Sequence, residues 1–446
     1  MPTRSEVAYF GAGPAPLPTP VIESSAQAFV NFDNTGLSLA EISHRSPTAN
    51  KILADAKGAL TKLYNIPDDY DIFFMQAGGT GEFSAACQNL VGCWIEQRRR
   101  KAVADLGEGK DNEVLDRVKK EIENELKVDY LVTGSWSLKA SQEATRLLGA
   151  KYVNVALDAR KSNNGKFGKI PDESEWKLTP KASAFTYMCD NETVDGVEFP
   201  SFPKSLENDD RIVVADMSSN FVSKKLNISR YGVIFVSILL AVLGLCLHFQ
   251  GGAQKNLGIT GITVVIIRKS LLSLVPPPTF LHELSSVLPT SGALPPIMFS
   301  FSTIASNNSL YNTLPIFNLY VATLVLQSLV SNFGTVSGQE DVADRKAKSI
   351  YDTLDAYPDF YHVVPDKNVR SRMNICVRII AGPKSEGGVT PDEAKEKAFL
   401  AGAEKRGLLG LKGHRSVGGL RISNYNAVPV ENVQKLVDWL NEFAKS

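Results

Sequence analysis

The chain has 446 residues, 43% hydrophobic and 22% charged, which is an ordinary globular composition and suits a large domain accompanied by a smaller one. Its 48 basic and 48 acidic side chains balance, so no overall field favours nucleic acid or an anionic membrane, and we expect neither as a partner. The five cysteines show no C-x-x-C pair and no zinc spacing, and the first residues lack a signal peptide. We therefore expect a reduced, cytoplasmic protein without a bound metal.

The chain opens with residues 9–18, which are rich in proline and glycine and cannot form a helix. They predict an extended N-terminal arm, residues 1–16, which we associate with the smaller domain. Helical periodicity then alternates with short apolar segments that predict strands, at 71–74, 130–133, 152–155, 184–188, 212–215, 231–235 and 262–267. This alternation predicts an α/β fold with a mainly parallel, doubly wound sheet.

Two further stretches indicate how the chain is divided. Residues 96–127 are highly charged and include a basic run, for which we favour a solvated surface helix over a site for a partner. Proline clusters at 276–278 and 295–296 mark a loop-rich passage, after which a long apolar-faced helix at 314–329 begins the last part of the chain. We expect a large domain over residues 17–300 and a smaller C-terminal α/β domain over residues 301–446.

An acid at a strand end and a lysine further along indicate a possible chemistry. Asp216 follows the apolar run 212–215, and ligands of open α/β sheets bind at the carboxyl ends of the strands. Lys255 follows the next apolar strand, within Gly-Gly-Ala-Gln-Lys-Asn. A lysine that forms a Schiff base and an acid that keeps the pyridinium nitrogen protonated are typical of enzymes that use pyridoxal phosphate. Taken alone, however, a strand-end aspartate is more often a helix cap or a turn former.

Nine motifs in order along nearly the whole chain carry a more specific signal. They are ISHR (42–45), GGTGEF (78–83), TGSWS (133–137), NETVDGVEF (191–199), ADMSSN (215–220), GAQKN (252–256), YNT (311–313), SRMN (371–374) and GHRSVGGLR (413–421). In order and spacing they resemble the phosphoserine aminotransferase family, whose members are class V, fold-type I enzymes. The resemblance implies a large domain with a mainly parallel seven-stranded sheet, a smaller C-terminal α/β domain, and pyridoxal 5'-phosphate as cofactor.

The resemblance also implies roles around the cofactor ring. Lys255 would form the Schiff base and then act as the general base, and Asp216 would pair with the ring nitrogen. Trp136 would stack on the ring, because aromatic faces can stack with an offset. Thr193 would form a hydrogen bond with the ring's phenolic oxygen.

A second group of residues would hold the cofactor's phosphate. Gly79 and Thr80 belong to a glycine-rich segment at a helix start, where backbone N–H groups suit an anion. Gln254, beside the lysine, would reach the phosphate as well. Asn312 and Thr313 would add phosphate contacts from the neighbouring subunit, which requires a homodimer with shared active sites.

The substrates of the family carry two anionic ends, and arginine binds such groups with a planar fork. Arg421 resembles the arginine that holds the α-carboxylate, whereas His44, Arg45, His414 and Arg415 resemble the pocket for the distal anion. The implied reaction is transfer of the amino group from L-glutamate to 3-phosphohydroxypyruvate, which gives O-phospho-L-serine and 2-oxoglutarate in serine biosynthesis. Within the SRMN motif, we expect the arginine to serve the structure.

Residues 236–250 (VSILLAVLGLCLHFQ) do not fit this pattern. With the strand before them they form an uncharged run long enough to raise a transmembrane helix, but a span there would disrupt the sheet. Removing them joins Phe235 to Gly251 and restores the spacing of the resemblance, and their ends can be encoded as GTAAGT and CAG, the ends of an intron. We hypothesise an unspliced intron; a transcript that always retains this stretch would exclude it.

Two other classes of function remain open. Another class V enzyme, such as a cysteine desulfurase or an alanine–glyoxylate aminotransferase, would share the lysine and the aspartate. A desulfurase would also need a mobile catalytic cysteine, which none of the five cysteines resembles. The remaining alternative is a catalytically inactive homologue or, given residues 236–250, a membrane-anchored binding protein.

Overall fold

The computed structural model describes residues 2–180, 183–207, 210–236, 255–382 and 389–446. At its centre lies a seven-stranded sheet in which only β10 runs antiparallel to its neighbours. Across the sheet the strands are β2 (Tyr70–Met75), β10 (Thr263–Arg268), β9 (Val233–Val236), β8 (Val213–Asp216), β5 (Thr186–Cys189), β3 (Val128–Val132) and β4 (Val153–Asp158). Each of the seven expected segments overlaps one of these strands, so the expected mainly parallel sheet is confirmed.

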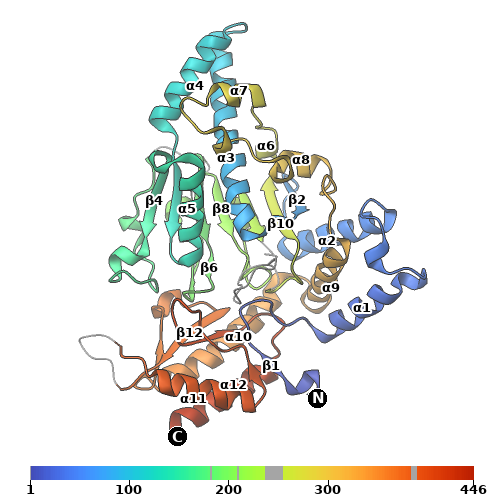
Figure 1. Cartoon of the computed structure of the whole chain (residues 1–446), viewed down its shortest axis with the longest axis vertical. Helices are drawn as coiled ribbons and strands as arrows, with labels where there is room; N and C mark the ends of the chain where they lie inside the picture. Colours follow the sequence, from blue (N-terminus) through green and yellow to red (C-terminus); the bar gives the residue numbers. More distant parts are fainter. Residues whose placement is uncertain (1, 181–182, 208–209, 237–254, 383–388) are drawn as a thin grey trace.

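Helices cover both faces of this sheet, as Figure 1 shows. Successive strand residues point to opposite faces: on β2, Ile72 and Phe74 join one apolar core, and Phe73 and Met75 join the other. The first core includes α1 (Thr19–Val30), α2 (Pro47–Tyr64) and α9 (Ile316–Phe333), and the second includes α3 (Gly78–Leu106), α4 (Asp111–Glu125), α5 (Ser135–Leu148), α6 (Lys269–Leu272), α7 (Pro278–Glu283) and α8 (Phe301–Ser306). Burial on both faces explains why the strands are continuous apolar runs.

The charged stretch 96–127 forms the end of α3 and all of α4, which pack against each other and extend away from the sheet (Figure 1). Val114, Val118 and Ile122, spaced four residues apart, are the buried residues of α4. Arg98 lies on the facing helix, 3.4 Å from a carboxylate oxygen of Glu121. The hairpin therefore has an apolar seam of its own, and part of its charge is paired within it.

The smaller domain is built on a three-stranded antiparallel sheet in the order β11 (Tyr361–Val363), β12 (Asn374–Ile379) and β14 (Leu420–Ser423). Its helices are α10 (Val336–Asp355), α11 (Glu393–Lys405) and α12 (Val430–Lys445). The N-terminal arm lies against this domain, because β1 (Ala8–Tyr9) pairs in parallel with β13 (Leu408–Leu409). Ala8 and Phe10 are buried in its apolar core.

We expected the smaller domain to begin at residue 301, but the packing places the division later. Phe301 and Ile304 of α8 lie in a core of the large sheet, and α9 packs along α2. Apart from residues of the arm, the core of the smaller sheet is formed from Ile350 onward. By packing, the two domains therefore meet between α9 and α10. Among the described residues, α9 is also the one helix with the length and hydropathy to cross a membrane; here it packs against α1, α2 and α10.

The anomalous segment lies almost entirely outside the described residues. Its first residue, Val236, is the last residue of β9, is 1% exposed and pairs with Val264. Residues 237–250 are not described, so the intron hypothesis stays a prediction.

Candidate active site

The candidate site lies at the carboxyl edge of the large sheet, where Asp216 is the last residue of β8. The backbone N–H of Ser218 donates to Asp216 Oδ1 at 2.9 Å, and the Ser218 hydroxyl donates to the same atom. On the other oxygen, Oδ2, the Tyr187 hydroxyl is 3.4 Å away. Burial raises the pKa of Asp216 above its usual value, and the Ser218 hydrogen bonds act in the opposite direction. Because its Oδ2 contact is long, this carboxylate keeps capacity for a stronger donor.

Lys255 lies in the same buried region and is 5% exposed. The next residue, Asn256, donates to the carbonyls of Ser219 and Phe221 at 3.2 and 3.1 Å, which ties the lysine to the segment that follows β8. Burial lowers the pKa of Lys255 from 10.5 to about 8, although the charge of Asp216 acts to raise it. An amine with that pKa is substantially neutral near pH 8 and can act as a nucleophile or as a base. Gln254 lies outside the described residues.

Trp136 and Thr193 are held together at this edge. The indole N–H of Trp136 donates to Thr193 Oγ1 at 2.9 Å, and the ammonium of Lys139 lies 4.2 Å from the ring centroid. Thr193 belongs to the hairpin formed by β6 (Asn191–Glu192) and β7 (Val197–Glu198), which lies on the side of the sheet facing the smaller domain (Figure 1). The hydrogen bond therefore fixes the orientation of the indole relative to this hairpin.

Two acids of the same hairpin bind the N-terminus of α5. The backbone N–H groups of Trp136 and Ser137 donate to Glu192 at 2.8 Å each, and that of Ser135 donates to Asp195 at 2.7 Å. These carboxylates occupy three of the four N–H groups that a helix start leaves unsatisfied. Burial, reinforced by Asp195, raises the pKa of Glu192 to about 7.

The start of α3 differs, because its N-cap residue Ala77 offers no side-chain hydrogen bond. Gly79 and Thr80 stand in its first turn. Gly78, at φ +62°, adopts a conformation that favours glycine, and its N–H donates to Thr263 Oγ1 at 3.2 Å. The start of α5 is occupied by carboxylates of its own chain. The start of α3 has no side-chain cap among the described residues, which is a feature that suits an anion.

Glu82 lies in the second turn of α3, and no role was predicted for it from the sequence. It is fully buried, and both of its carboxyl oxygens lack a hydrogen-bond partner among the described residues. Burial raises the pKa of Glu82 well above its usual value, and the nearby charge of Asp216 acts in the same direction. Burial therefore favours the protonated, neutral form of Glu82. No role was predicted for Glu192 or Asp195 either. Glu82, Glu192 and Asp195 all lie within motifs that resemble the family, and an acid in such a motif is a signal that could have identified them.

Arg421, on β14 of the smaller domain, reaches the hairpin. Its guanidinium donates to the Thr193 carbonyl at 3.1 Å, and it is 4% exposed. Arg421 and Lys255 act on each other electrostatically, and Asp195 also lies close enough to act on Arg421. The structure thus brings Lys255, Asp216, Trp136, Thr193 and Arg421 into one region.

The two expected His-Arg pairs lie on turns. His44 and Arg45 precede α2; Arg45 is exposed, and the Nε2 atom of His44 is buried without a partner among the described residues. His414 and Arg415 lie between β13 and β14; Arg415 is exposed, and His414 Nδ1 is 2.5 Å from the hydroxyl of Ser416. Within one chain, therefore, both arginines face outward.

Asn312 and Thr313 lie next to the start of α3 of the same chain. The side chain of Gln76 accepts a hydrogen bond from Asn312 at 3.1 Å and donates to the Thr313 carbonyl at 2.6 Å. Thr313 itself is exposed. This arrangement places both residues beside the glycine-rich segment that Gly79 and Thr80 belong to.

Comparison with known proteins identifies the family. The model of the family "Aminotransferase class-V" matches residues 7–108 and 106–436. Over 447 aligned residues, the chain is 42% identical to the phosphoserine aminotransferase of Saccharomyces cerevisiae, covering 99% of this chain and 98% of that protein. The chain belongs to the class V aminotransferases, and among them to the phosphoserine aminotransferases.

Other relatives agree with this assignment. The phosphoserine aminotransferase of Drosophila melanogaster is 38% identical over 98% of both chains. Among solved structures, the phosphoserine aminotransferase from Bacillus circulans subsp. alkalophilus is 31% identical with a TM-score of 0.75, covering 98% of both chains. The pyridoxal-phosphate-bound enzyme from Trichomonas vaginalis is also 31% identical, with a TM-score of 0.74, and covers 97% of this chain and 99% of that one.

Replacing Lys255 with alanine should leave a folded protein that no longer binds pyridoxal phosphate covalently. Borohydride reduction followed by peptide mass spectrometry should find the modified lysine at 255 in the unaltered protein and nowhere in the variant. Lys346 provides a matched control: it is 1% exposed and burial lowers its pKa to about 7, but its amine donates to the Tyr425 and Val428 carbonyls. Lys346→Met should leave the modification at 255 intact. Modification of Lys346 instead would contradict the assignment.

The pH dependence of cofactor attachment should report the lowered pKa of Lys255. Only the neutral amine attacks an aldehyde, so the rate of covalent uptake should rise with pH and reach half its maximum near pH 8. Asp216→Asn removes a charge that raises the pKa of this lysine, so the midpoint should move to lower pH. Stopped-flow absorbance of the cofactor-free protein mixed with pyridoxal phosphate measures both. A midpoint near the ordinary lysine pKa of 10.5 would show that burial does not lower the pKa of Lys255.

Proposed function

We propose that this protein transfers the amino group of L-glutamate to 3-phosphohydroxypyruvate and thereby forms O-phospho-L-serine and 2-oxoglutarate in serine biosynthesis. One observation carries the proposal: a buried lysine of lowered pKa and a buried aspartate lie together at the carboxyl edge of a fold-type I sheet, beside Trp136 and Arg421. The printed names of the relatives, which match over nearly the full chain, support the same reaction.

The residues present fit pyridoxal phosphate. The uncapped start of α3, with Gly79 and Thr80, suits its phosphate, and Asp216 Oδ2 suits the ring N–H. The hydroxyl of Thr133 is buried without a partner among the described residues, beside the expected ring position at Trp136. When bound, the cofactor supplies an electron sink that weakens the bond between the substrate's Cα and its hydrogen.

The chain's own residues supply positioning and proton transfer. Lys255 Nζ, neutral in an appreciable fraction near pH 8, can accept the proton from the substrate's Cα and later return one. Asp216 offers an acceptor that stabilises a proton on the ring nitrogen. Trp136, fixed through Thr193 and through the N-terminus of α5, covers one side of the site and excludes water.

Substrate anions are assigned to two places. Arg421 stands beside Lys255 and Thr193 and is placed to bind the α-carboxylate that both substrates share. Arg45 and Arg415, with His44 and His414, are proposed to bind the distal phosphate or carboxylate. Because these arginines are exposed in the single chain, they are available to an anion or to a second subunit.

We also propose a homodimer in which Asn312 and Thr313 reach the neighbouring subunit's phosphate site. Large apolar side chains are exposed nearby. Tyr311, which precedes Asn312, is 42% exposed. Ile297 and Met298, close to α3, are 57% and 38% exposed. Exposed apolar surface of this kind favours a protein–protein contact. A shared site would also explain why Thr313 is exposed in one chain.

The four cysteines that the structure describes argue against the desulfurase alternative and support a cytoplasmic location. Cys87, Cys93, Cys189 and Cys376 are free and buried, and burial raises the pKa of each thiol. A nucleophilic cysteine requires access and a lowered pKa, which none of these four has. Unpaired thiols are also typical of reducing compartments.

Alanine substitutions should separate the two anion sites. Arg421→Ala should lower kcat/KM for every amino donor, because each presents an α-carboxylate. Arg45→Ala and Arg415→Ala should affect glutamate and phosphoserine but spare alanine, a donor without a distal anion. Losing one buried charge-assisted contact costs on the order of 2–5 kcal/mol, or ~30- to several-thousand-fold. Equal tolerance of all three substitutions would show that the anions bind elsewhere.

Cofactor binding and dimerisation should be linked if Asn312 and Thr313 reach across subunits. Sedimentation at decreasing protein concentration should then show a dimer that dissociates at lower concentration with pyridoxal phosphate than without it. Asn312→Ala with Thr313→Ala should reduce this difference, since the phosphate contacts are lost. A cofactor-loaded monomer with undiminished affinity would exclude a shared site.

A further inference from the structure

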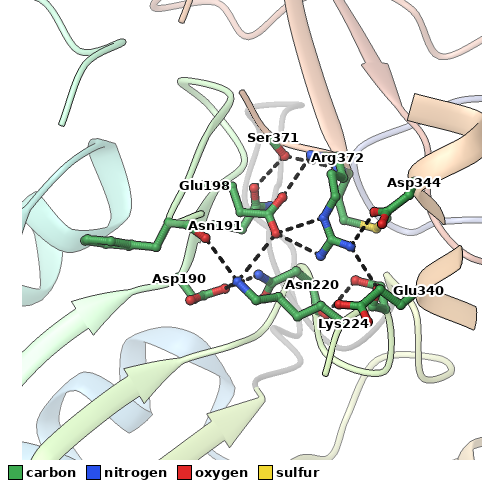
Figure 2. Close-up of polar contacts among 12 residues, drawn as sticks. Asp190, Asn191, Glu198, Asn220, Lys224, Glu340, Asp344, Ser371 and Arg372 are labelled. Atoms are coloured by element: carbon green, nitrogen blue, oxygen red, sulfur yellow. Dashed lines mark hydrogen bonds and ion pairs between the residues drawn. The ribbon is translucent and has the colours of Figure 1, made fainter. Parts of the chain in front are cut away.

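Two adjacent residues of the smaller domain, Ser371 and Arg372, form hydrogen bonds with the base of the β6–β7 hairpin (Figure 2). The Ser371 hydroxyl donates to Asn191 Oδ1 at 2.5 Å. The backbone N–H of Arg372 donates to Glu198 Oε2 at 2.8 Å, and its guanidinium donates to Glu198 Oε1 at 2.9 Å through NH2 and 3.2 Å through Nε. Because Asn191 and Glu198 pair with each other in the hairpin, both of its strands are held at one point.

The guanidinium of Arg372 also reaches two other elements. Its NH1 donates to Asp344 of α10 at 2.8 Å and to the carbonyl of Ser223, in the segment that follows β8, at 3.3 Å. One side chain therefore joins the hairpin, the segment that follows Asp216, and α10. Figure 2 shows the guanidinium between Glu198 and Asp344.

A second cation, Lys224, lies beside Glu198, so the fold does not depend on Arg372 alone. Glu198 also faces Lys224, whose Nζ lies 3.6 Å from Glu198 and 2.7 Å from Asp190. Removing the guanidinium would leave Glu198 with a cation of its own domain. The structural role of Lys224 is thus confined to the large domain, whereas Arg372 connects the two domains.

Both sides of this connection lead to Arg421. On the small-domain side, β12 begins two residues after Arg372, and its Cys376 pairs with Arg421 on β14. On the other side, the hairpin carries Thr193, whose carbonyl accepts from Arg421 at 3.1 Å and whose hydroxyl accepts from Trp136. Arg372 therefore links the same two elements, the hairpin and the smaller sheet, that carry Thr193 and Arg421.

We propose that Arg372 is a positioning residue that sets the place of Arg421 relative to Thr193 and Trp136, and thereby sets the affinity of the site for the substrates' α-carboxylate. It touches no reacting atom. The inference rests on the proposed function, because it takes Arg421 as the carboxylate-binding group.

Arg372→Ala in the cofactor-loaded protein should weaken carboxylate binding without disturbing the cofactor. A probe of binding alone is glutarate, which carries two carboxylates and no amino group. Its inhibition constant, and the KM of glutamate, should rise roughly 10- to 100-fold, the effect expected of a displacement of about 1 Å in a binding group. The kcat, the absorbance of the bound cofactor and the cofactor's dissociation constant should change by less than about threefold, since Asp216, Lys255 and Trp136 keep their contacts. An unchanged inhibition constant would overturn the proposal.

Arg211 supplies a matched control. It forms a more deeply buried pair with Asp129, at 3.1 Å, with side-chain exposures of 8% and 0%, against 20% and 5% for Arg372 and Glu198. It also donates to Thr186 Oγ1 at 3.0 Å. This pair lies entirely in the large domain, at the amino ends of β3 and β5, on the edge opposite the site. Arg211→Ala should lower Tm but leave the inhibition constant of glutarate unchanged. An equal rise in both variants would show a general loss of stability and would overturn the positioning role.

Two further variants complete the test. Arg372→Lys keeps a cation beside Glu198 but loses the fork; it should fold even where alanine does not, and should raise the inhibition constant by a smaller factor. If Arg372 acts through Arg421, its substitution should have little further effect in an Arg421→Ala background, and full additivity would overturn the proposal. Absence of amino transfer from glutamate in the unaltered protein would instead refute the proposed function, which distinguishes the two failures.

Discussion

Four acids in and beside one hairpin impose the main constraint on this structure. Asp190, Glu192, Asp195 and Glu198 are all buried, and a buried carboxylate without donors is costly. They find donors on three elements: Asp190 on the segment after β8, Glu192 and Asp195 on the start of α5, and Glu198 on the smaller domain's SRMN motif. Satisfying these acids therefore fixes the relative positions of the elements that carry Trp136, Asp216 and Arg421.

The same burial sets the chemistry of the site. Removing Lys255 from water disfavours its ammonium form, and removing Glu82 and Asp216 from water disfavours their carboxylates. The three effects differ in outcome because the surroundings differ. Asp216 receives hydrogen bonds from Ser218, whereas Glu82 receives none from the described residues. The ionised form is therefore favoured more at Asp216 than at Glu82.

The sequence predicted the fold, and it named several residues that the structure brings into one region, for physical reasons. Strands buried on both faces are continuous apolar runs, so all seven could be located. Asp216 at the carboxyl end of one strand then indicated at which edge of the sheet the site lies. The packing favours a domain division later than residue 301, because α9 packs along α2. The sequence could not indicate this, since an apolar helix can belong to either domain. Glu82, Glu192 and Asp195 were missed because their roles depend on which amides and charges the fold brings to them. Those partners are distant in sequence.

Stability alone does not explain the hairpin's ion pairs. A buried pair such as Arg372 with Glu198 gains little over well-packed apolar side chains, because desolvation offsets most of the attraction. What such a pair adds is directionality: a guanidinium fork accepts one arrangement of carboxylate, carbonyl and second acid, whereas apolar contacts tolerate sliding. The residues proposed to hold the cofactor lie in the large domain, and Arg421 lies in the smaller one. A sliding interface would therefore leave the proposed cofactor residues in place and displace Arg421. Directional contacts are needed where two domains must contribute to one site, and the four buried acids of the hairpin region lie beside that junction.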